Sequence, residues 1–404
     1  CIRQEQTIIG RIATLPRWQQ LMADQWQVSA ELDRVVVGES RCQGPQRLWV
    51  RQYLTNKERH KAMRYGTTVT GLVQLKPLPS QWNPGSLPDQ ARFASRSVDA
   101  SGSLKGEWQI LEEPSLLHQF RSRRLAAWSE RVGEGWVILR ALVLGDARAI
   151  DRDSWRDFRH LGVVHILVIS GLHIGLLAAM CQLILGLPRR LFTFRGECGR
   201  GRFIAMVVLV ITGVYAMLVG ATLPVTRAYL MLAMTQVPTI LGWSTRSHRA
   251  LLLTLVAMVL WNPRVLLGAS FWLSASATWL LVCGLRGNRG IFGLAALQVQ
   301  MVLFMTPLTL FWFGEASWLG VATNLVLVPL VTMVMVPLGL IGLVLSEWMP
   351  SIAEHLWWIC RVTWEALAPA LSIVLSYCRS IGVIQSGLSW IGFAMGVLAI
   401  GLWA

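Results

Sequence analysis

The sequence predicts a mixed fold: a small β-barrel of the OB type, followed by a polytopic α-helical membrane bundle of about 8–10 helices with amphipathic and re-entrant segments. The first observation behind this prediction is the distribution of charge. The 404 residues are 54% hydrophobic and 15% charged, and beyond residue 160 there is no Asp and no Lys. Such depletion suits hydrocarbon better than water. The second observation is that the hydrophobic period changes near residue 113.

Residues 1–112 alternate apolar and polar side chains, which is typical of half-buried strands. Five such segments are enough for a small barrel of the OB type. They are residues 7–13, 26–32, 48–54, 67–75 and 107–111. The prolines and glycine of residues 77–88 indicate a loop. We therefore assign residues 1–112 to an extracytoplasmic OB-like domain.

Residues 113–160 are predicted to form amphipathic connecting helices at the membrane surface. Leu117, Phe120, Arg124 and Trp128 follow one another at helical spacing, with further arginines nearby. A basic amphipathic helix beside a membrane domain lies naturally on the bilayer surface. The alternative interpretation is a solvated helix that packs on the barrel.

Residues 161–404 contain apolar segments long enough to cross about 30 Å of hydrocarbon. The sequence predicts spans near 163–187, 203–221, 224–242, 249–261, 269–285, 291–313, 356–377 and 381–403. Residues 317–345 are interrupted by Pro329 and Pro337, which predicts a broken or re-entrant pair.

Arginine placement predicts the orientation of the bundle. The loop 188–202 holds five arginines and is expected on the cytoplasmic side, because positive residues favour that side. The first span then starts outside, so that residues 1–160 are extracytoplasmic. The predicted location is a bacterial inner membrane, crossed several times.

The seven cysteines include no CxxC pair, and the histidine spacing fits no zinc motif, so the sequence predicts no metal site and no cofactor. Cys1 and Cys42 are candidates for a disulfide if their domain lies outside the cytoplasm. Because the chain starts with Cys1 rather than Met and has no signal peptide, we expect it to be part of a longer protein.

The stretch 162–175, GVVHILVISGLHIG, places His165, Ser170 and His173 in an otherwise apolar segment beside Gly171 and Gly175. Polar side chains at membrane depth are costly and usually face a cavity or the bundle interior. The spacing predicts that one face lines a cavity with all three. The alternative interpretation is that they form hydrogen bonds between helices as structural contacts.

Two other functions fit the same residues. A proton-coupled transporter of a small solute would use His165 and His173 as relays. An intramembrane hydrolase would use Ser170 and His173, but the membrane half has no Asp to orient the imidazole and no evident oxyanion turn. The sequence therefore predicts no catalytic residue in this chain.

Several ordered motifs resemble the ComEC family of competence proteins, the DNA-uptake channels of bacterial inner membranes. They are LVLGDARAI at 142–150, HILVISGLHIGLLA from His165, YAMLVGATLPVTRAYLM at 215–231, WNP at 261–263, GASFWLS at 268–274, PLTLFWFG and NLVLVP within 306–329, and WNPG at 82–85. The resemblance covers essentially the whole chain. It implies that the first helices of the family precede Cys1, and that its metallo-β-lactamase-like domain, which carries any nuclease activity, follows Ala404.

The resemblance implies a channel that passes one strand of transforming DNA, with single-stranded DNA and the lipid bilayer as partners. It also implies a periplasmic DNA receptor and, in the cytoplasm, an ATP-driven translocase or single-strand-binding proteins. Bare phosphates cannot enter hydrocarbon, so the strand needs a polar path. Arg227 is the candidate phosphate partner, because guanidinium binds phosphate in a fork; its alternative role is that of a snorkelling structural arginine. Asn262, Thr323 and Asn324 are further candidates beside proline-broken backbone.

In the OB-like domain, arginines alternate with aromatic residues, a pattern that offers both charge and base stacking to DNA. The candidates are Arg34, Arg47, Arg51 and Trp49. Acidic residues stand among them, so the alternative interpretation is a solvated surface of mixed charge.

Overall fold

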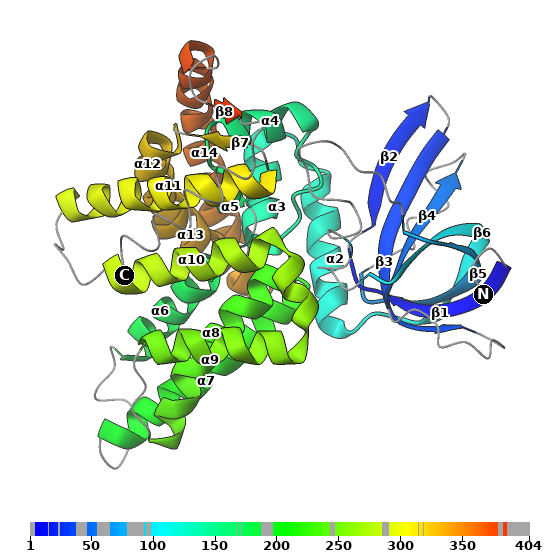
Figure 1. Cartoon of the computed structure of the whole chain (residues 1–404), viewed down its shortest axis with the longest axis horizontal. Helices are drawn as coiled ribbons and strands as arrows, with labels where there is room; N and C mark the ends of the chain where they lie inside the picture. The colour runs from blue at the N-terminus through cyan, green and yellow to red at the C-terminus, as the bar shows by residue number, and fades with distance from the viewer. Residues whose placement is uncertain are drawn as a thin grey trace. The chain divides into compact units, whose positions relative to one another are not determined.

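The computed structural model describes residues 5–14, 16–22, 25–37, 47–54, 65–78, 93, 98–167, 169, 171–186, 197–242, 247–284, 291–313, 315–317, 319–378 and 383–385. The chain divides into two compact units (Figure 1). The first comprises Cys1–Ala127 with Arg264–Gly268, and the second comprises Trp128–Pro263 with Ala269–Ala404. Cys1 and Cys42 lie outside the described residues, so their pairing stays a prediction.

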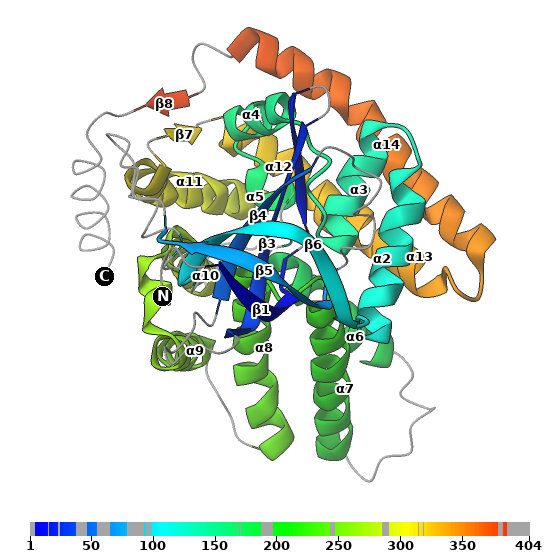
Figure 2. The same cartoon turned by 90° about the vertical axis from the view of Figure 1, so that its right-hand side faces the viewer.

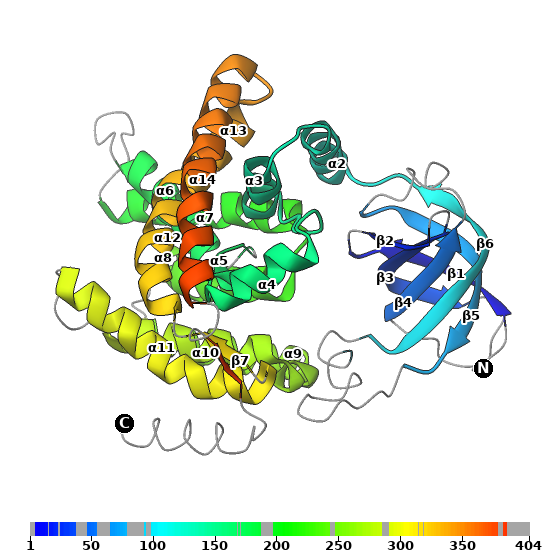
Figure 3. The same cartoon turned by 90° about the horizontal axis from the view of Figure 1, so that it is seen from above.

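The first unit is a closed five-stranded β-barrel, as the alternation predicted (Figure 3). The strand order is β1–β5–β6–β4–β3, and β3 pairs with β1 to close the ring. All of these pairs are antiparallel except β4 with β6. An additional strand, β2, extends β3. The strands are β1 (Glu5–Ile12), β2 (Arg17–Met22), β3 (Gln25–Val37), β4 (Arg47–Leu54), β5 (Thr68–Lys76) and β6 (Ala100–Glu112).

The barrel core consists of the apolar residues that alternate along these strands. Each side chain removed from water contributes about 1.5–3 kcal/mol. The residues exposed by 1% or less are Ile8, Ile12, Leu32, Leu48, Val69 and Val73. Because a shift of one residue would turn this set outward, the core also fixes the register of the strands.

Helix α2 (Leu116–Ser129) follows β6 in the chain, and its first two turns contact Tyr65 of the first unit. The rings of His118 and Tyr65 meet edge to face with centroids 4.6 Å apart, and the Arg121 guanidinium lies 5.2 Å from the centre of the Tyr65 ring. Burial raises the pKa of Tyr65, an effect that the charge of Arg121 partly opposes. Arg121 is only 2% exposed, and these contacts favour the interpretation in which the helix packs on the barrel.

The second unit is helical, and among the described residues three stretches are long and apolar enough to cross a membrane: Gly199–Leu218, Gly320–Leu345 and Pro350–Tyr377. The helices are α3 (Glu134–Leu144), α4 (Arg152–His160), α5 (Val164–Leu167), α6 (Gly171–Gly186), α7 (Glu197–Leu218), α8 (Leu223–Leu241), α9 (Ser247–Trp261), α10 (Ala269–Gly284), α11 (Ile291–Phe313), α12 (Gly320–Leu330), α13 (Val336–Leu345) and α14 (Pro350–Cys378). Short elements complete it: the 3₁₀ turn η2 (Pro263–Leu267), which the unit boundary crosses, the π turn η3 (Val331–Met335) and the strands β7 (Glu315–Ser317) and β8 (Val383–Gln385).

The helices of the second unit run in two main directions. Helices α9, α10 and α11 cross the view of Figure 1, and Figure 2 shows α9 end-on and α11 obliquely. Helices α7 and α8 instead stand side by side along the vertical of Figure 2. The apolar segments are therefore packed at steep crossing angles rather than as a bundle of parallel helices.

Three predicted spans differ from the structure. Residues 317–345 do not form a broken pair: α12, η3 and α13 make one helix, because the π turn accommodates Pro337 without ending it. The predicted span 163–187 consists of two helices, α5 and α6. The described part of 381–403 is the strand β8, which pairs with β7, so a helix from residue 381 is wrong there.

The turn between α4 and α5 packs against the start of α12. Ser317 Oγ donates a hydrogen bond to the carbonyl of His160, and Thr323 Oγ1 donates to the carbonyl of Leu161 at 2.6 Å. Gly162 has a φ of +72°, and a Cβ on this residue would lie 2.9 Å from Gly320 Cα. Only glycine fits this position without moving one of the two backbones.

We predict that Gly162→Ala lowers the free energy of unfolding by roughly 1–3 kcal/mol, because both the backbone angle and the contact with Gly320 oppose a side chain. The matched control is Gly175→Ala in α6, where no atom lies within 4 Å of the added Cβ. This control should keep or slightly raise stability. The measurement is the thermal unfolding of the purified protein in detergent; equal losses in the two variants would contradict the prediction.

Candidate functional site

Three of the motifs singled out in the sequence meet around one small cavity in the second unit. Its lining residues come from the end of α3, the segment after α5 and the turn between α7 and α8. They are Ala141, Gly145, Ala147, Leu167, Ile169, Val219 and Thr222. The cavity measures about 50 Å³. A site for a small molecule usually needs roughly 300 Å³ or more, so this space marks where the motifs pack together and cannot hold a nucleotide.

A buried ion cluster follows α3 beside this cavity. Gly145 ends the helix in the left-handed region, with a φ of +68°, and Asp146 comes next with no exposed surface. Asp146 accepts hydrogen bonds from Arg140 at 2.5 Å and from Arg148 at 2.6 Å. Burial by itself would raise the pKa of Asp146, but the hydrogen bonds and charges of Arg148 and Arg140 outweigh it and hold this pKa well below its usual range.

The polar residues of 162–175 are separated by the interruption between α5 and α6. His173 lies in the first turn of α6 and is 1% exposed, whereas His165 in α5 is exposed. Leu167 and Ile169, which follow His165 in the chain, line the small cavity. Ser170 lies outside the described residues, so a common face for all three stays a prediction.

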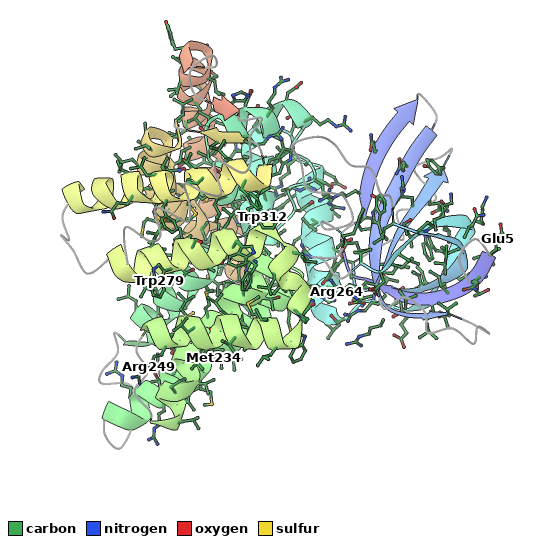
Figure 4. The ribbon with its side chains drawn as sticks, viewed as in Figure 1. Glu5, Met234, Arg249, Arg264, Trp279 and Trp312 are labelled. Atoms are coloured by element: carbon green, nitrogen blue, oxygen red, sulfur yellow. The ribbon has the colours of Figure 1, made fainter. Side chains whose placement is uncertain are left out.

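Arg227 and Gly171 are brought together by helix packing. A Cβ on Gly171, the first residue of α6, would lie 3.4 Å from the Cβ of Ala228 in α8. Arg227 is 4% exposed, and its guanidinium donates to Ser270 Oγ of α10 at 2.7 Å. Figure 4 labels Met234 and Trp279, which lie further along α8 and α10. Asn262 follows the last turn of α9 and donates its backbone N–H to the Met258 carbonyl at 2.9 Å.

Asn324 belongs to a separate polar contact at the start of α12. It is 6% exposed, and its Nδ2 lies near Gly320, which packs on Gly162. Thr323 is bonded to the α4–α5 turn, as described above. Among the described residues, no group of three or more His, Cys, Asp or Glu side chains gathers as a metal site would require. Arg227 therefore belongs to one neighbourhood, with Ser270, and Asn324 belongs to another, with Gly320 and Gly162.

Sequence reasoning missed Ser270, which accepts a hydrogen bond from Arg227, and Asp146, which holds the ion cluster together. Ser270 stands in the quoted motif at 268–274, and Asp146 in the motif at 142–150, but neither was selected. A signal existed for Asp146, because it is one of the last acids before the acid-poor half of the chain. Hydrophobic periodicity cannot reveal that Ser270 faces Arg227, because the two residues are 43 positions apart and belong to different helices.

The outer face of strands β3 and β4 carries the barrel's aromatic and cationic candidates. The Arg51 guanidinium lies 4.3 Å from the centre of the Trp49 ring, and the Trp49 and Phe93 rings are 5.2 Å apart. Tyr53, two residues further along β4, is 60% exposed. Strands 2 and 3 of OB folds, which correspond to β3 and β4 here, present the face that binds oligonucleotides or oligosaccharides. Trp49 and Arg51 therefore occupy a typical ligand face.

Arg34 and Arg47 lie elsewhere on β3 and β4. Arg34 is exposed and has a φ of +52° at a β-bulge where β3 pairs with β1. Such a backbone angle is uncommon for a residue with a side chain. Arg47 stands opposite Asp33, which also forms an ion pair with Arg11 at 2.8 Å. This end of the barrel has mixed charge, as the alternative interpretation supposed.

Comparison with known proteins decides the family. The family model described as "Competence protein" matches residues 142–404, which include every motif around the cavity. The chain belongs to the competence protein family. No solved structure matches it. Its family and its three long apolar helices together identify it as a membrane protein.

Curated relatives of this competence protein come from several bacteria. ComE operon protein 3 of Bacillus subtilis is 29% identical over 56% of this chain and 29% of the relative. Recombination protein 2 of Haemophilus influenzae is 27% identical over 66% and 35%. Competence protein ComA of Neisseria gonorrhoeae is 25% identical over 76% and 48%. The matches cover between about a third and a half of the length of these relatives.

We predict that Asp146→Asn destabilises this competence protein by roughly 3–5 kcal/mol, because Arg140 and Arg148 lose the buried carboxylate that they share. The control is Asp153→Asn, which removes an exposed ion pair with Arg156 and should cost far less. Thermal unfolding in detergent compares the two.

The pH dependence of this cluster has a defined sign. Because the pKa of Asp146 is lowered on folding, its contribution is fully present above about pH 4, the ordinary carboxyl range. It is lost only as the pH falls through the lowered value. The difference in stability between the wild type and Asp146→Asn should therefore stay constant from pH 7 to pH 5; a difference that shrinks over this interval would refute the assignment.

Proposed function

We propose that this chain carries one strand of DNA across a bacterial inner membrane during natural competence. The membrane unit would supply the channel, and the barrel, on the extracytoplasmic side, would receive the strand. The chain would cross the membrane several times and would perform no catalytic step itself. Its partners would be single-stranded DNA, the lipid bilayer, a periplasmic DNA receptor and a cytoplasmic ATP-driven translocase or single-strand-binding proteins. The resemblance in sequence and membership of the competence family support this proposal.

One observation carries the proposal: the central helices contain cationic and polar groups but almost no carboxylate. Between Asp157 and Glu315 the sequence has a single acid, Glu197. Arg227 of α8 is nevertheless buried. A polyanion is repelled by carboxylates and attracted by guanidinium, so this composition suits a path for phosphates. The path would include His165, Ser170, Gly171, His173 and Arg227, with Asn262 and Asn324 beside it.

The same observation weighs against the two other functions. Proton-coupled transporters rely on intramembrane Asp, Glu and His chains, and here the acidic members are missing. A hydrolase built on Ser170 and His173 would need a carboxylate to orient the imidazole, and the only acid between Asp157 and Glu315 starts α7, beyond α6 in the chain.

The barrel face gives a direct test of DNA reception. We predict that Trp49→Ala weakens binding of a fluorescent single-stranded oligonucleotide to the full chain about tenfold, because base stacking on an aromatic ring is lost. Arg51→Ala should weaken binding and reduce its salt dependence. The control is Lys105→Ala, which removes an exposed cation from β6. Fluorescence anisotropy in detergent measures the affinities; unchanged binding by Trp49→Ala, or equal losses in Arg51→Ala and Lys105→Ala, would contradict a specific role of this face.

The path through the membrane unit is tested at His165. In a competent host that carries a cysteine-free version of this chain, His165→Cys is treated with a charged methanethiosulfonate reagent. We expect reaction, because His165 is exposed, and a fall in the uptake of DNase-protected labelled DNA, because the added group would obstruct the proposed path. The control is Val210→Cys on α7, which is also exposed but belongs to an apolar helix. Modified His165→Cys protein with unchanged uptake would exclude this residue from the path.

A further inference from the structure

Arg227 is a buried cation whose environment is incomplete. Its side chain is 4% exposed, and Ser270 Oγ accepts its only hydrogen bond among the described residues, at 2.7 Å. The Nε atom is buried and has no hydrogen-bond partner in the part of the chain that the structure describes. A guanidinium keeps its charge in proteins, so burial does not neutralise it. A buried charge of this kind is costly unless another group compensates it.

No carboxylate compensates Arg227 within the described residues: the ion pairs formed there join other residues. The sequence explains why, because Glu197 is the only acid between Asp157 and Glu315. Glu197 is the first residue of α7, and α8 begins shortly after the opposite end of that helix. A helix of this length spans about 33 Å at 1.5 Å per residue, which is far beyond ion-pair range.

The neighbours of Arg227 add positive rather than negative potential. Ser270 is the second residue of α10, and Arg227 lies one turn into α8. The Thr222 side chain makes no capping hydrogen bond to the start of α8. The first residue of α6, Gly171, packs on Ala228. Helix N-termini carry partial positive charge and unpaired N–H groups, so a cation placed among three of them is unfavourable unless an anion joins them.

We propose that Arg227 and Ser270, at the N-termini of α8 and α10, form a binding site for one phosphate-type monoanion. The guanidinium donates to two oxygens in its planar fork, and the first-turn N–H groups of the helices share the remaining negative charge. Ser270 holds the guanidinium toward this position while the site is empty. Every acceptor is a phosphate oxygen, so the recognition is independent of base sequence.

The identity of the anion rests on the proposed function: in a DNA path it is a phosphodiester of the strand. A phospholipid headgroup and inorganic phosphate present the same chemistry. Binding of a small anion is measured without DNA, so the anion site can be confirmed even if the chain does not transport DNA. DNA uptake is measured separately, so it can be confirmed even if the anion site is absent.

The test uses the full chain purified in detergent, with dimethyl phosphate and inorganic phosphate as probes and with thermal unfolding as the readout. We expect each probe to raise the Tm of the wild type by a few degrees, since a ligand that binds only the folded state stabilises it. Arg227→Met should abolish this shift. Arg227→Lys should keep a point charge without the fork and weaken the apparent affinity roughly tenfold.

The sharpest variant is Ser270→Asp, which places a carboxylate beside Arg227 and supplies the missing anion from within the chain. This variant should be at least as stable as the wild type without ligand and should show no shift with either probe. Ser270→Ala is the matched control and should keep a weaker shift. No shift in the folded wild type, or an equal shift in Arg227→Met, would overturn the site.

Two further measurements distinguish a nucleic-acid strand from a lipid headgroup as the source of the anion. A short oligothymidylate that competes with dimethyl phosphate identifies the site as one for a nucleic-acid strand. A shift caused by nanodiscs containing phosphatidylglycerol, compared with phosphatidylcholine alone, and unaffected by the oligonucleotide, identifies a lipid headgroup. Both results support the anion site, and each assigns its occupant.

Discussion

The cost of burying charge governs the membrane unit. Three arrangements of arginine show how the chain meets this cost. Arg131 forms a two-point ion pair with Glu354 at 2.6 Å where both side chains remain partly exposed. Arg140 and Arg148 share the buried Asp146. Among the described residues, Arg227 has only the hydroxyl of Ser270 as a partner. A charge that is neutralised within the protein holds parts of the fold together, whereas a charge without a counter-ion remains available to a ligand. These arginines therefore have different roles, although all belong to the same unit.

The period of hydrophobic residues made much of the fold predictable, because burial on one face imposes a repeat that can be counted. The five barrel strands and most of the helices follow from it. Strand β2 was missed because RWQQLM at 17–22 does not alternate, and its pairing with β3 is what keeps it extended. The interruption before α6 was not predicted, since residues 163–187 are apolar enough to read as one span. The position of Pro337 within a continuous helix depends on the π turn, which no residue pattern announces.

The candidate site was less predictable than the fold, because it consists of contacts between helices distant in sequence. Polarity in an apolar segment selected His173, Arg227 and Asn324, and all three are buried; their role in a DNA path stays a prediction. The partners depend on packing: Ser270 for Arg227, and the Gly162 turn for Asn324. Spacing on an ideal helix suggested that His165 and His173 share a side, but the break between α5 and α6 gives them different exposure. A periodicity argument holds only as long as the helix is continuous.

The small cavity and the buried Arg227 together bear on how a strand would pass. The motifs around the cavity close on a space of about 50 Å³, and their small residues, such as Ala141 and Gly145, let backbones approach closely. Such contacts hold helices together in a membrane, because small residues bring two backbones into close van der Waals contact. The ion cluster at Asp146 follows α3 beside the same cavity and ties Arg140 of that helix to Arg148. An anion bound at Arg227 would lie one turn beyond the start of α8, and Val219 and Thr222, which come just before that helix, line the cavity. The proposed recognition of a phosphate is therefore placed next to the closed contact of the three motifs.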